Sequence, residues 1–592
     1  MTRNTIDPAR SSPPKSPDVS VPSSQRRSRS SSYSSPHPGT KRNGWLALFG
    51  HELEGPYLTL GPDALRCARA LEVYTTASGE PIFAQMRNPN DLETLQSTRI
   101  LPLLGVDRRS SLETDAVGTV VADWSERAPS TINDSLESIR DTLRTDGTLV
   151  FTADGPTGPL LRTLRESQQD TRARRRSIAA AVGSTVGRYR TIAERAGFET
   201  VDIYAFVPDA ATPSYLFPVG DEGTIVRLLE FIFAELEYGR TLGETSLSIV
   251  SRAGPTRALL AALCERLLPS LLVVCSNTPR AERICGNPVL EDCRPLVLPG
   301  RSRSVVLEIA SDDRAIERVW KVPNCPQNAP LTAREHALLS WLRAPEHGFS
   351  RRETLPAGRA VETAVGTARM EVPTQGTALS ERLEGDPDSF EAVLETGLEW
   401  LLAFQQTFRS ERFEPSPQMV RDELTFEPTG LEPQPLSASV PTFTTPVHGD
   451  FMPSNVHVDD EGTVTGVIDW EYGAADGCPI VDAGLFLLDT AKRVFGGYPA
   501  ALEALSPSLE RDALSTPESE LEPYRDAAQR YLAAYCRTLE IPPRTISVYL
   551  PAIYLHRLRI DWHYQTTIVH DETLAARSRF VERLYEAGLG LE

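Results

Sequence analysis

The stretch TTPVHGDFMPSNVHVDDEGTVTGVIDWEYG, residues 444–473, constrains the fold of this 592-residue chain more than any other. It places Asp450 and Asp469 beside strand-forming residues, where carboxylates are rarely buried unless they are paired or bind metal. Residues 456–470 predict a β-hairpin with its turn at Asp459–Gly462. Because a hairpin returns the chain, we expect Asp469 to face the loop that carries Asp450.

This stretch carries a recognisable pattern: His-Gly-Asp at 448–450, Asn455 five residues after the aspartate, and Ile-Asp-Trp-Glu at 468–471. The pattern resembles the catalytic loop and metal-binding strand of aminoglycoside phosphotransferase and choline kinase-like enzymes, which are small-molecule relatives of the protein kinases. The resemblance implies that Asp450 orients an acceptor hydroxyl or accepts its proton. It also implies that Asn455 and Asp469 bind Mg²⁺, an ion that prefers hard oxygen ligands.

The resemblance requires an ATP-binding part upstream of this loop. Residues 296–309, LVLPGRSRSVVLEI, read as strand, glycine turn and strand, and they resemble the nucleotide-covering loop of the family around Gly300. Lys321 follows on the next predicted strand and is one of only four lysines in the chain. It stands where the family keeps its phosphate-binding lysine, and a lysine kept where arginine is the usual choice indicates that a compact charge is needed.

Two further segments complete the expected nucleotide site. A helix is predicted over 331–342 with a threonine as its N-cap, and its Glu335 is the expected ion-pair partner of Lys321. Residues 367–379, TARMEVPTQGTAL, resemble the strand and hinge between the two lobes of the family, where backbone groups hold adenine. Gln375 lies where the chain is expected to cross over.

Later residues are expected to support the loop and the acceptor. Asp482, in CPIVDAG, matches a later aspartate of the family, which we expect to brace the catalytic loop rather than to bind metal. The helical tail from residue 521 to the end is expected to form the acceptor pocket.

In residues 45–278, strand-like and helix-like segments alternate, which predicts a parallel sheet with helices on both faces. One predicted helix covers residues 135–147. The phrases at 136–155 and 193–209 resemble the class I methyltransferase fold, late in its core and at the approach to its final hairpin.

The cofactor loop of that fold should be a glycine-rich turn after the first strand, so that backbone can approach the ligand. This chain has LTLGPDA at 58–64, with one glycine and a proline, and no acidic residue closes the next strand. We therefore expect a degenerate domain that does not bind S-adenosylmethionine, with an active methyltransferase as the alternative.

Composition limits the classes of partner. Residues 1–44 are rich in Ser and Pro, hold eight Lys and Arg against two Asp, and predict a disordered basic tail. The remainder carries 53 basic and 78 acidic residues, which argues against a specific nucleic-acid-binding face. With no run of about 20 apolar residues, no membrane span is expected. The eight cysteines contain no C-x-x-C pair, so free buried thiols are expected rather than zinc ligands.

The sequence thus predicts an α/β Rossmann-like domain followed by an α+β bilobal protein kinase-like domain. The expected boundaries are a tail over 1–44, a degenerate methyltransferase-like domain over 45–278, a linker over 279–294 and a kinase domain over 295–592. The expected activity is ATP- and Mg²⁺-dependent phosphorylation of a small-molecule hydroxyl on a sugar, amino-alcohol or glycan end, in the cytoplasm. The alternatives are a bifunctional methyltransferase and kinase that modifies a glycan, and a pseudokinase scaffold.

Overall fold

The computed structural model describes most of the chain between residues 53 and 541. The described residues are 46, 53–75, 79–86, 97, 99–104, 115–125, 127, 129–158, 185–207, 213–219, 265–266, 268–278, 294–300, 303–309, 316–324, 328–363, 366–385, 387–410, 443–497, 501 and 518–541. The predicted tail, nearly all of the predicted linker and the last part of the predicted acceptor pocket lie outside them.

The first half of the described chain forms the strands at one end of a large sheet. Its elements are β1 (Tyr57–Leu60), α2 (Ala64–Tyr74), β2 (Ile82–Met86), β3 (Ile100–Leu104), β4 (Val117–Trp124), α3 (Pro129–Thr142), β5 (Leu143–Asp154), α6 (Val186–Arg195), β6 (Thr200–Val207), β7 (Tyr215–Pro218) and β8 (Ser270–Ser276). The strands β3, β2, β1, β4 and β5 pair in parallel in that order, as the alternating pattern predicts. The next strands differ, since β8 lies antiparallel between β5 and β6.

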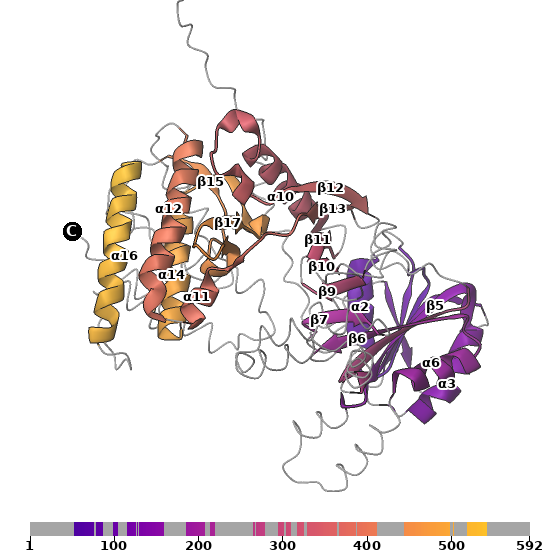
Figure 1. Cartoon of the computed structure of the whole chain (residues 1–592). Helices are drawn as coiled ribbons and strands as arrows, with labels where there is room; N and C mark the ends of the chain where they lie inside the picture. The colour runs from indigo at the N-terminus through magenta and orange to yellow at the C-terminus, as the bar shows by residue number, and fades with distance from the viewer. Residues whose placement is uncertain are drawn as a thin grey trace, which may run out of the picture.

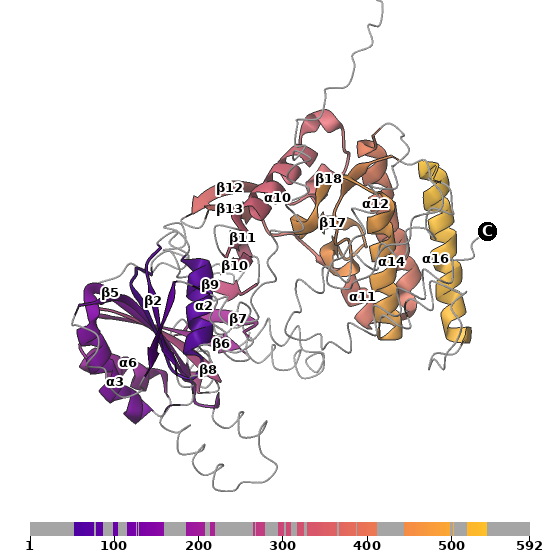
Figure 2. The same ribbon diagram turned by 180° about the vertical axis from the view of Figure 1, so that it is seen from behind.

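Helices cover both faces of this part of the sheet. Successive strand residues point to opposite faces, and both sets are apolar and need to be buried. Leu58 and Val120 pack with the apolar faces of α3 and α6, whereas their neighbours Tyr57 and Val121 pack with α2. Figures 1 and 2 show α2 on one side of the sheet and α3 with α6 on the other. The prediction of a two-faced α/β layer is therefore confirmed for these strands.

The predicted helix over 135–147 is too long at its C-terminal end. Helix α3 ends at Thr142, and the next residue, Leu143, begins β5 and pairs with Val117 of β4. Leu143 is buried in that position, so the ladder and the core decide the conformation rather than the local helical pattern.

The second half adds more strands and then a group of helices. Its elements are β9 (Arg294–Leu298), β10 (Arg303–Ile309), β11 (Ile316–Pro323), α10 (Ala329–Leu342), η6 (Pro345–His347), η7 (Arg352–Thr354), β12 (Gly358–Thr363), β13 (Gly366–Glu371), β14 (Thr377–Ala378), α11 (Ser380–Gly385), η8 (Pro387–Ser389), α12 (Phe390–Phe408), β15 (Thr445–Val447), η10 (Pro453–Asn455), β16 (Val456–Val458), β17 (Val464–Val467), η11 (Trp470–Tyr472), β18 (Ala474–Gly477), α14 (Ile480–Phe495) and α16 (Glu518–Leu539). We call β9–β13 with α10 the strand segment, and β14–α16 the helical segment.

The strand segment continues the first sheet without a break. The order is β12-β13-β11-β10-β9-β7-β6-β8-β5-β4-β1-β2-β3, and the joint is the antiparallel pair of Leu216 on β7 with Val297 on β9. Both side chains are completely buried. The apolar layer that holds Tyr57 and Val121 extends across this joint to Trp320 on β11. The two halves of the chain thus share a sheet and an apolar core.

The helical segment has its own core, in which α11, α12, α14 and α16 pack together with the inner face of α10. Figures 1 and 2 show α12, α14 and α16 side by side, at the opposite end of the molecule from β5. Helix α10 begins earlier than predicted, with Asn328 as its N-cap and Pro330 in its first turn, so Thr332 is a buried residue inside the helix rather than its cap. Within the described residues, no helix is long and apolar enough to cross a membrane.

The shared core predicts that the first half and the strand segment unfold as one unit. Val297→Ala removes buried methyl groups at the joint and should lower the free energy of unfolding by about 2 kcal/mol. In native-state hydrogen exchange, the amides of β5 and β10 should lose protection together. The matched substitution Leu398→Ala in α12 lies in the other core and should act mainly on the helical segment. Loss of protection confined to β9–β11 in Val297→Ala would show that the joint does not couple the two halves.

Candidate active site

The loop that follows β15 is held by buried backbone contacts. Gly449 has a φ of +78°, and a Cβ there would lie 2.5 Å from the carbonyl oxygen of Tyr472, so only glycine fits the turn. Asp482, in the first turn of α14, accepts hydrogen bonds from the backbone N–H groups of His448 (2.7 Å) and Gly449 (2.9 Å). The predicted bracing contact of Asp482 is therefore present.

His448 connects this loop to the strand that leads to Asp469. Its Nε2 lies 2.7 Å from the carbonyl oxygen of Ile468, and its Nδ1 lies 3.2 Å from the backbone nitrogen of Asp450. Burial lowers the pKa of His448 to about 4, so the ring is neutral near pH 7. The two contacts assign the proton to Nε2, which donates to Ile468, while Nδ1 accepts from Asp450. The imidazole thus links the backbone of Asp450 to the backbone of Ile468.

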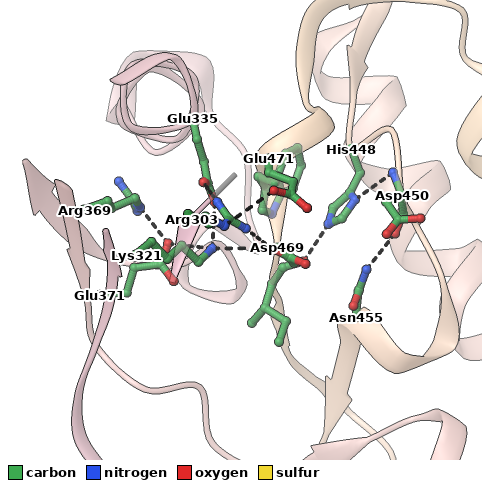
Figure 3. A network of polar contacts seen from close by, with 12 residues as sticks. Arg303, Lys321, Glu335, Arg369, Glu371, His448, Asp450, Asn455, Asp469 and Glu471 are labelled. Atoms are coloured by element: carbon green, nitrogen blue, oxygen red, sulfur yellow. Dashed lines mark hydrogen bonds and ion pairs between the residues drawn. The ribbon is translucent and has the colours of Figure 1, made fainter. Parts of the chain in front are cut away.

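Asn455 completes the same network. The side-chain Nδ2 of Asn455 donates to the backbone carbonyl of Asp450 at 2.8 Å. The backbone carbonyl of Asn455 accepts from the backbone N–H of Ile468 at 2.9 Å. The hairpin of β16 and β17 has its turn at Asp459–Gly462 as predicted, closed by a 3.1 Å backbone bond. The hairpin therefore brings Asp469 to the loop of Asp450, as Figure 3 shows.

Asp469 itself has a left-handed backbone, with a φ of +69°. This conformation is uncommon for a residue other than glycine and often marks a functional site. It is followed by Trp470, which is completely buried and donates to the carbonyl of Val467 at 2.8 Å. The side chain of Asp469 is 38% exposed, so part of it is accessible from solvent.

The predicted ion pair of the strand segment is present. Lys321 Nζ lies 2.7 Å from Glu335 Oε1, 3.2 Å from Glu371 Oε1 and 3.9 Å from Asp469 Oδ1. Burial by itself would lower the pKa of Lys321, but the carboxylates of Glu335 and Glu371 outweigh it and raise the pKa. The lysine is therefore charged, and it points toward Asp469 as expected.

Arg303, the first residue of β10, lies among the same carboxylates. Its guanidinium contacts Glu335 and Asp469, and its Nε lies 3.5 Å from Glu471. Burial opposes ionisation of Glu335, yet Arg303 and Lys321 bring its pKa down to about 2. Burial raises the pKa of Glu471 to about 7 against the opposing effect of Arg303. Figure 3 shows this cluster facing the loop of Asp450.

A second arginine supports the cluster from behind. Arg369 is 1% exposed; its Nε donates to Glu371 at 2.6 Å, and its other nitrogens contact His336 Nδ1 and the carbonyl of Pro356. It thereby neutralises Glu371, which faces Lys321. Arg369 and Glu371 stand two residues apart on β13, and this alternation of charge on one strand face is a signal in the sequence that could have identified them.

The other two predicted cofactor-binding residues, Gly300 and Gln375, lie at the edges of the candidate site. Gly300 ends the described part of the glycine turn, and a Cβ there would collide with the carbonyl of Arg303. Gln375 has an exposed side chain, and its carbonyl accepts from Thr465 Oγ1 at 2.6 Å, which ties the segment before β14 to the hairpin. The sequence interpretation missed Arg303, Glu371 and Glu471 as members of the charged cluster.

The donor set suits a magnesium ion. Asn455 and Asp469 carry the oxygen atoms that Mg²⁺ prefers, and such an ion takes one or two protein ligands with substrate phosphates and water. Because Nδ2 of Asn455 is used by Asp450, the amide oxygen points the other way. Among the described residues, no group of three or more His, Cys, Asp or Glu is arranged to hold a metal by itself. Asn455 and Asp469 are therefore the residues that could hold Mg²⁺, together with ligands from outside the protein.

The first half of the described chain shows a different arrangement at the carboxyl ends of its strands. Gly61 has a φ of +100°, and its N–H donates to Gln85 Oε1 at 3.1 Å. A Cβ at Gly61 would collide with the carbonyl of Asp123. The carboxylate of Asp123 accepts from Thr152 Oγ1 at 2.7 Å and from Ser125. The backbone N–H of Gly61 and the carboxylate of Asp123 are thus both hydrogen-bonded to other groups of the protein.

Comparisons with known proteins address both halves of the chain. Residues 396–513 match the model of the phosphotransferase enzyme family, a stretch that contains Asp450, Asn455, Asp469 and Asp482 but not Lys321. No curated protein matches the chain. Among solved structures, an aminoglycoside phosphotransferase from Streptomyces rimosus is 15% identical, covering 50% of this chain and 93% of its own, with a TM-score of 0.27.

Methyltransferases are also among the similar structures. A phosphoethanolamine N-methyltransferase from Haemonchus contortus is 11% identical, with a TM-score of 0.24, and covers 40% of this chain; this chain spans only 53% of that enzyme. A possible histamine N-methyltransferase from Thermotoga maritima is 10% identical over 40% of this chain and 92% of its own, with a TM-score of 0.23. Both resemblances noted in the sequence thus recur, and TM-scores this low establish nothing about function.

The environment of Asp482 predicts a pH dependence of stability. Burial raises its pKa from the ordinary 3.8 to about 7, against the two backbone N–H groups that favour the charged form. Its ionisable neighbours, His448 and Tyr535, stay neutral from pH 5 to 8. A raised carboxyl pKa means that the folded protein holds the proton more tightly than the unfolded chain, so this contribution to stability falls as pH rises toward 7.

Asp482→Asn lacks this titration. The free energy of unfolding of the native protein, measured relative to that of the variant by urea unfolding, should therefore fall by about 2 kcal/mol between pH 5 and pH 8. Comparing the two proteins cancels the titration of other groups. A difference that stays constant over this range, or that grows with pH, would contradict the assignment.

Proposed function

We propose that residues 295–592 form an ATP- and Mg²⁺-dependent phosphotransferase that acts on a hydroxyl group of a small molecule. The observation that supports this best is the convergence of Asp450, Asn455 and Asp469 from one side and the Lys321–Glu335 pair from the other. The family match of residues 396–513 supports phosphoryl transfer independently. The strand segment and the helical segment would be the two lobes of a kinase-like domain.

Asp450 would act on the acceptor. Phosphoryl transfer requires little covalent chemistry from the protein, so positioning of the hydroxyl and stabilisation of charge are the main needs. The backbone of Asp450 is fixed on both sides, by His448 at its nitrogen and by Asn455 at its carbonyl. Its carboxylate would orient the hydroxyl and accept its proton as the bond to phosphorus forms.

Lys321 would bind the phosphates of ATP. Glu335 and Glu371 keep the ammonium charged and direct it toward Asp469, at 3.9 Å. Asn455 and Asp469 would hold Mg²⁺, which when bound supplies positive charge that offsets the negative charge of the phosphates. Gly300 would let the strand–turn–strand of β9 and β10 approach the nucleotide, and Gln375 would lie at the crossover between the lobes.

The acceptor would be a sugar, an amino-alcohol or the end of a glycan, bound against the helical segment that includes α16. The protein would work in the cytoplasm, without nucleic acid or a membrane span. Residues 45–278 would be a methyltransferase-like domain without its cofactor, joined through a linker at 279–294 and preceded by a tail at 1–44. A pseudokinase scaffold would have no use for Lys321 together with Asp450, Asn455 and Asp469.

Asp450→Asn should lower phosphoryl transfer about 10²- to 10⁴-fold, because the amide cannot accept the hydroxyl proton. ATP affinity should change little, since the amide fills the same space. The measurement is release of ADP from ATP and Mg²⁺ across a panel of sugars, amino-alcohols and glycans. Asp460→Asn, an exposed aspartate in the hairpin turn, provides the control and should keep full activity. Equal turnover in Asp450→Asn would remove this residue from the mechanism.

The bifunctional alternative depends on cofactor binding by residues 45–278. Because Gly61 donates its N–H to Gln85 and Asp123 is hydrogen-bonded to Thr152, we expect no binding of S-adenosylmethionine at micromolar concentration. Isothermal titration calorimetry of the full chain with S-adenosylmethionine measures this directly, with ATP as a positive reference for the other domain. Micromolar binding would favour the bifunctional enzyme instead.

A further inference from the structure

Arg303 lies at the centre of the charged cluster, although the proposed reaction gives it no role. Its side chain is 10% exposed and contacts Glu335 of the strand segment together with Asp469 and Glu471 of the helical segment. Of these partners, Asp469 is a proposed magnesium ligand and Glu335 is the partner of the proposed phosphate-binding lysine. The guanidinium therefore lies where phosphates and metal would meet.

The glycine turn fixes the backbone from which Arg303 projects. Asn324 on the chain after β11 donates to the carbonyl of Gly300 at 2.6 Å and accepts from Ser304 Oγ at 2.9 Å. The close approach of Gly300 to the carbonyl of Arg303 leaves no space for a side chain at residue 300. Both ends of the turn are thus anchored to one side chain, and the first strand residue after the turn points its side chain into the site (Figure 3).

The partners of Arg303 are ones that a phosphate can replace. A guanidinium binds planar or tetrahedral oxyanions through two parallel hydrogen bonds, and a polyphosphate offers more charge than a single carboxylate. Here the guanidinium bridges carboxylates of two segments instead of forming a closed pair with one of them. Lys321, at 3.9 Å from the same oxygen of Asp469, adds a second positive charge beside it. Both charges disfavour a bare divalent cation at Asp469.

We propose that Arg303 is a second phosphate-binding residue of the nucleotide site, which in the nucleotide-free protein rests on Asp469 and Glu471 and there competes with Mg²⁺. The inference rests on the proposed phosphotransferase function. When ATP binds, its phosphates attract the guanidinium away from Asp469 and so free this carboxylate for the metal. Nucleotide and metal therefore bind together more favourably than either does alone.

Loss of the guanidinium has opposite effects on the two ligands. Without Arg303, ATP loses a charge-assisted hydrogen-bond partner and should bind about tenfold or more weakly. A bare divalent cation loses a competitor and should bind Asp469 more tightly. A role confined to folding would weaken both, because Glu335, Asp469 and Glu471 would repel each other without the arginine.

The test compares the full chain with Arg303→Gln and Arg303→Lys. Binding of ATP in excess EDTA is measured by calorimetry, and binding of Mn²⁺ without nucleotide is measured by electron paramagnetic resonance. Arg303→Gln should bind ATP at least tenfold more weakly and Mn²⁺ several-fold more tightly, and Arg303→Lys should lie between it and the native protein for ATP. Arg318→Gln removes a half-exposed arginine from the neighbouring strand β11, paired with Glu308 at 3.1 Å, and should match the native protein in both.

The outcomes distinguish a failure of this inference from a failure of the proposed phosphotransferase function. If the native protein and Arg318→Gln bind ATP and Arg303→Gln binds it equally well or more tightly, Arg303 is not a phosphate ligand and the inference is wrong while the proposed function stands. If Arg303→Gln weakens the binding of both ligands, its role is structural and the inference is also wrong. If the native protein binds ATP neither in EDTA nor with Mg²⁺ present, the proposed function fails, and the inference fails with it.

Discussion

Two backbone N–H groups donating to one buried carboxylate hold the centre of this structure together. Asp482 accepts from His448 and Gly449, and the turn at Gly449 is possible only because that residue lacks a side chain. Burying a carboxylate is costly, as the raised pKa of Asp482 shows, and the two hydrogen bonds offset part of that cost. From this anchor His448 reaches Ile468, so the position of Asp469 depends on the same contact.

The charged cluster opposite the loop shows how the segments meet. Arg303 and Lys321 come from the strand segment, and Asp469 and Glu471 come from the helical segment. Buried ion pairs of this kind contribute little net stability, because desolvation opposes the attraction. Their effect is to hold the charged groups of Arg303 and Lys321 beside the partly exposed side chain of Asp469.

The continuous sheet gives the first half of the chain a structural role whatever its chemistry. Leu216 and Val297 join the two parts in one ladder, and a common apolar layer runs from Tyr57 to Trp320. The strands that carry Arg303 and Lys321 are therefore supported by the first half of the chain. This part of the chain thus holds the neighbouring strands in place through the shared sheet and apolar layer.

The sequence by itself determined the local features of this protein. The hairpin after Asn455 and the glycine turn at Gly300 follow from short-range conformational preferences, and the loop of Asp450 follows from a motif contained in one stretch of chain. The ion pair of Lys321 with Glu335 was expected from a family resemblance rather than from the spacing of the residues. The catalytic roles assigned to Asp450, Lys321 and Glu335 remain predictions.

Only the tertiary structure decided the long-range features. The pairing of β7 with β9 joins strands far apart in the chain, and no local pattern specifies which edges meet. The partners of Arg303 are Glu335 of α10, Asp469 just before η11 and Glu471 within it, so the sequence shows the charge of this residue without showing which carboxylates surround it. Leu143 likewise became a strand residue because β4 lay beside it. In each case the deciding energy comes from burial and pairing with distant residues, which a local sequence pattern does not contain.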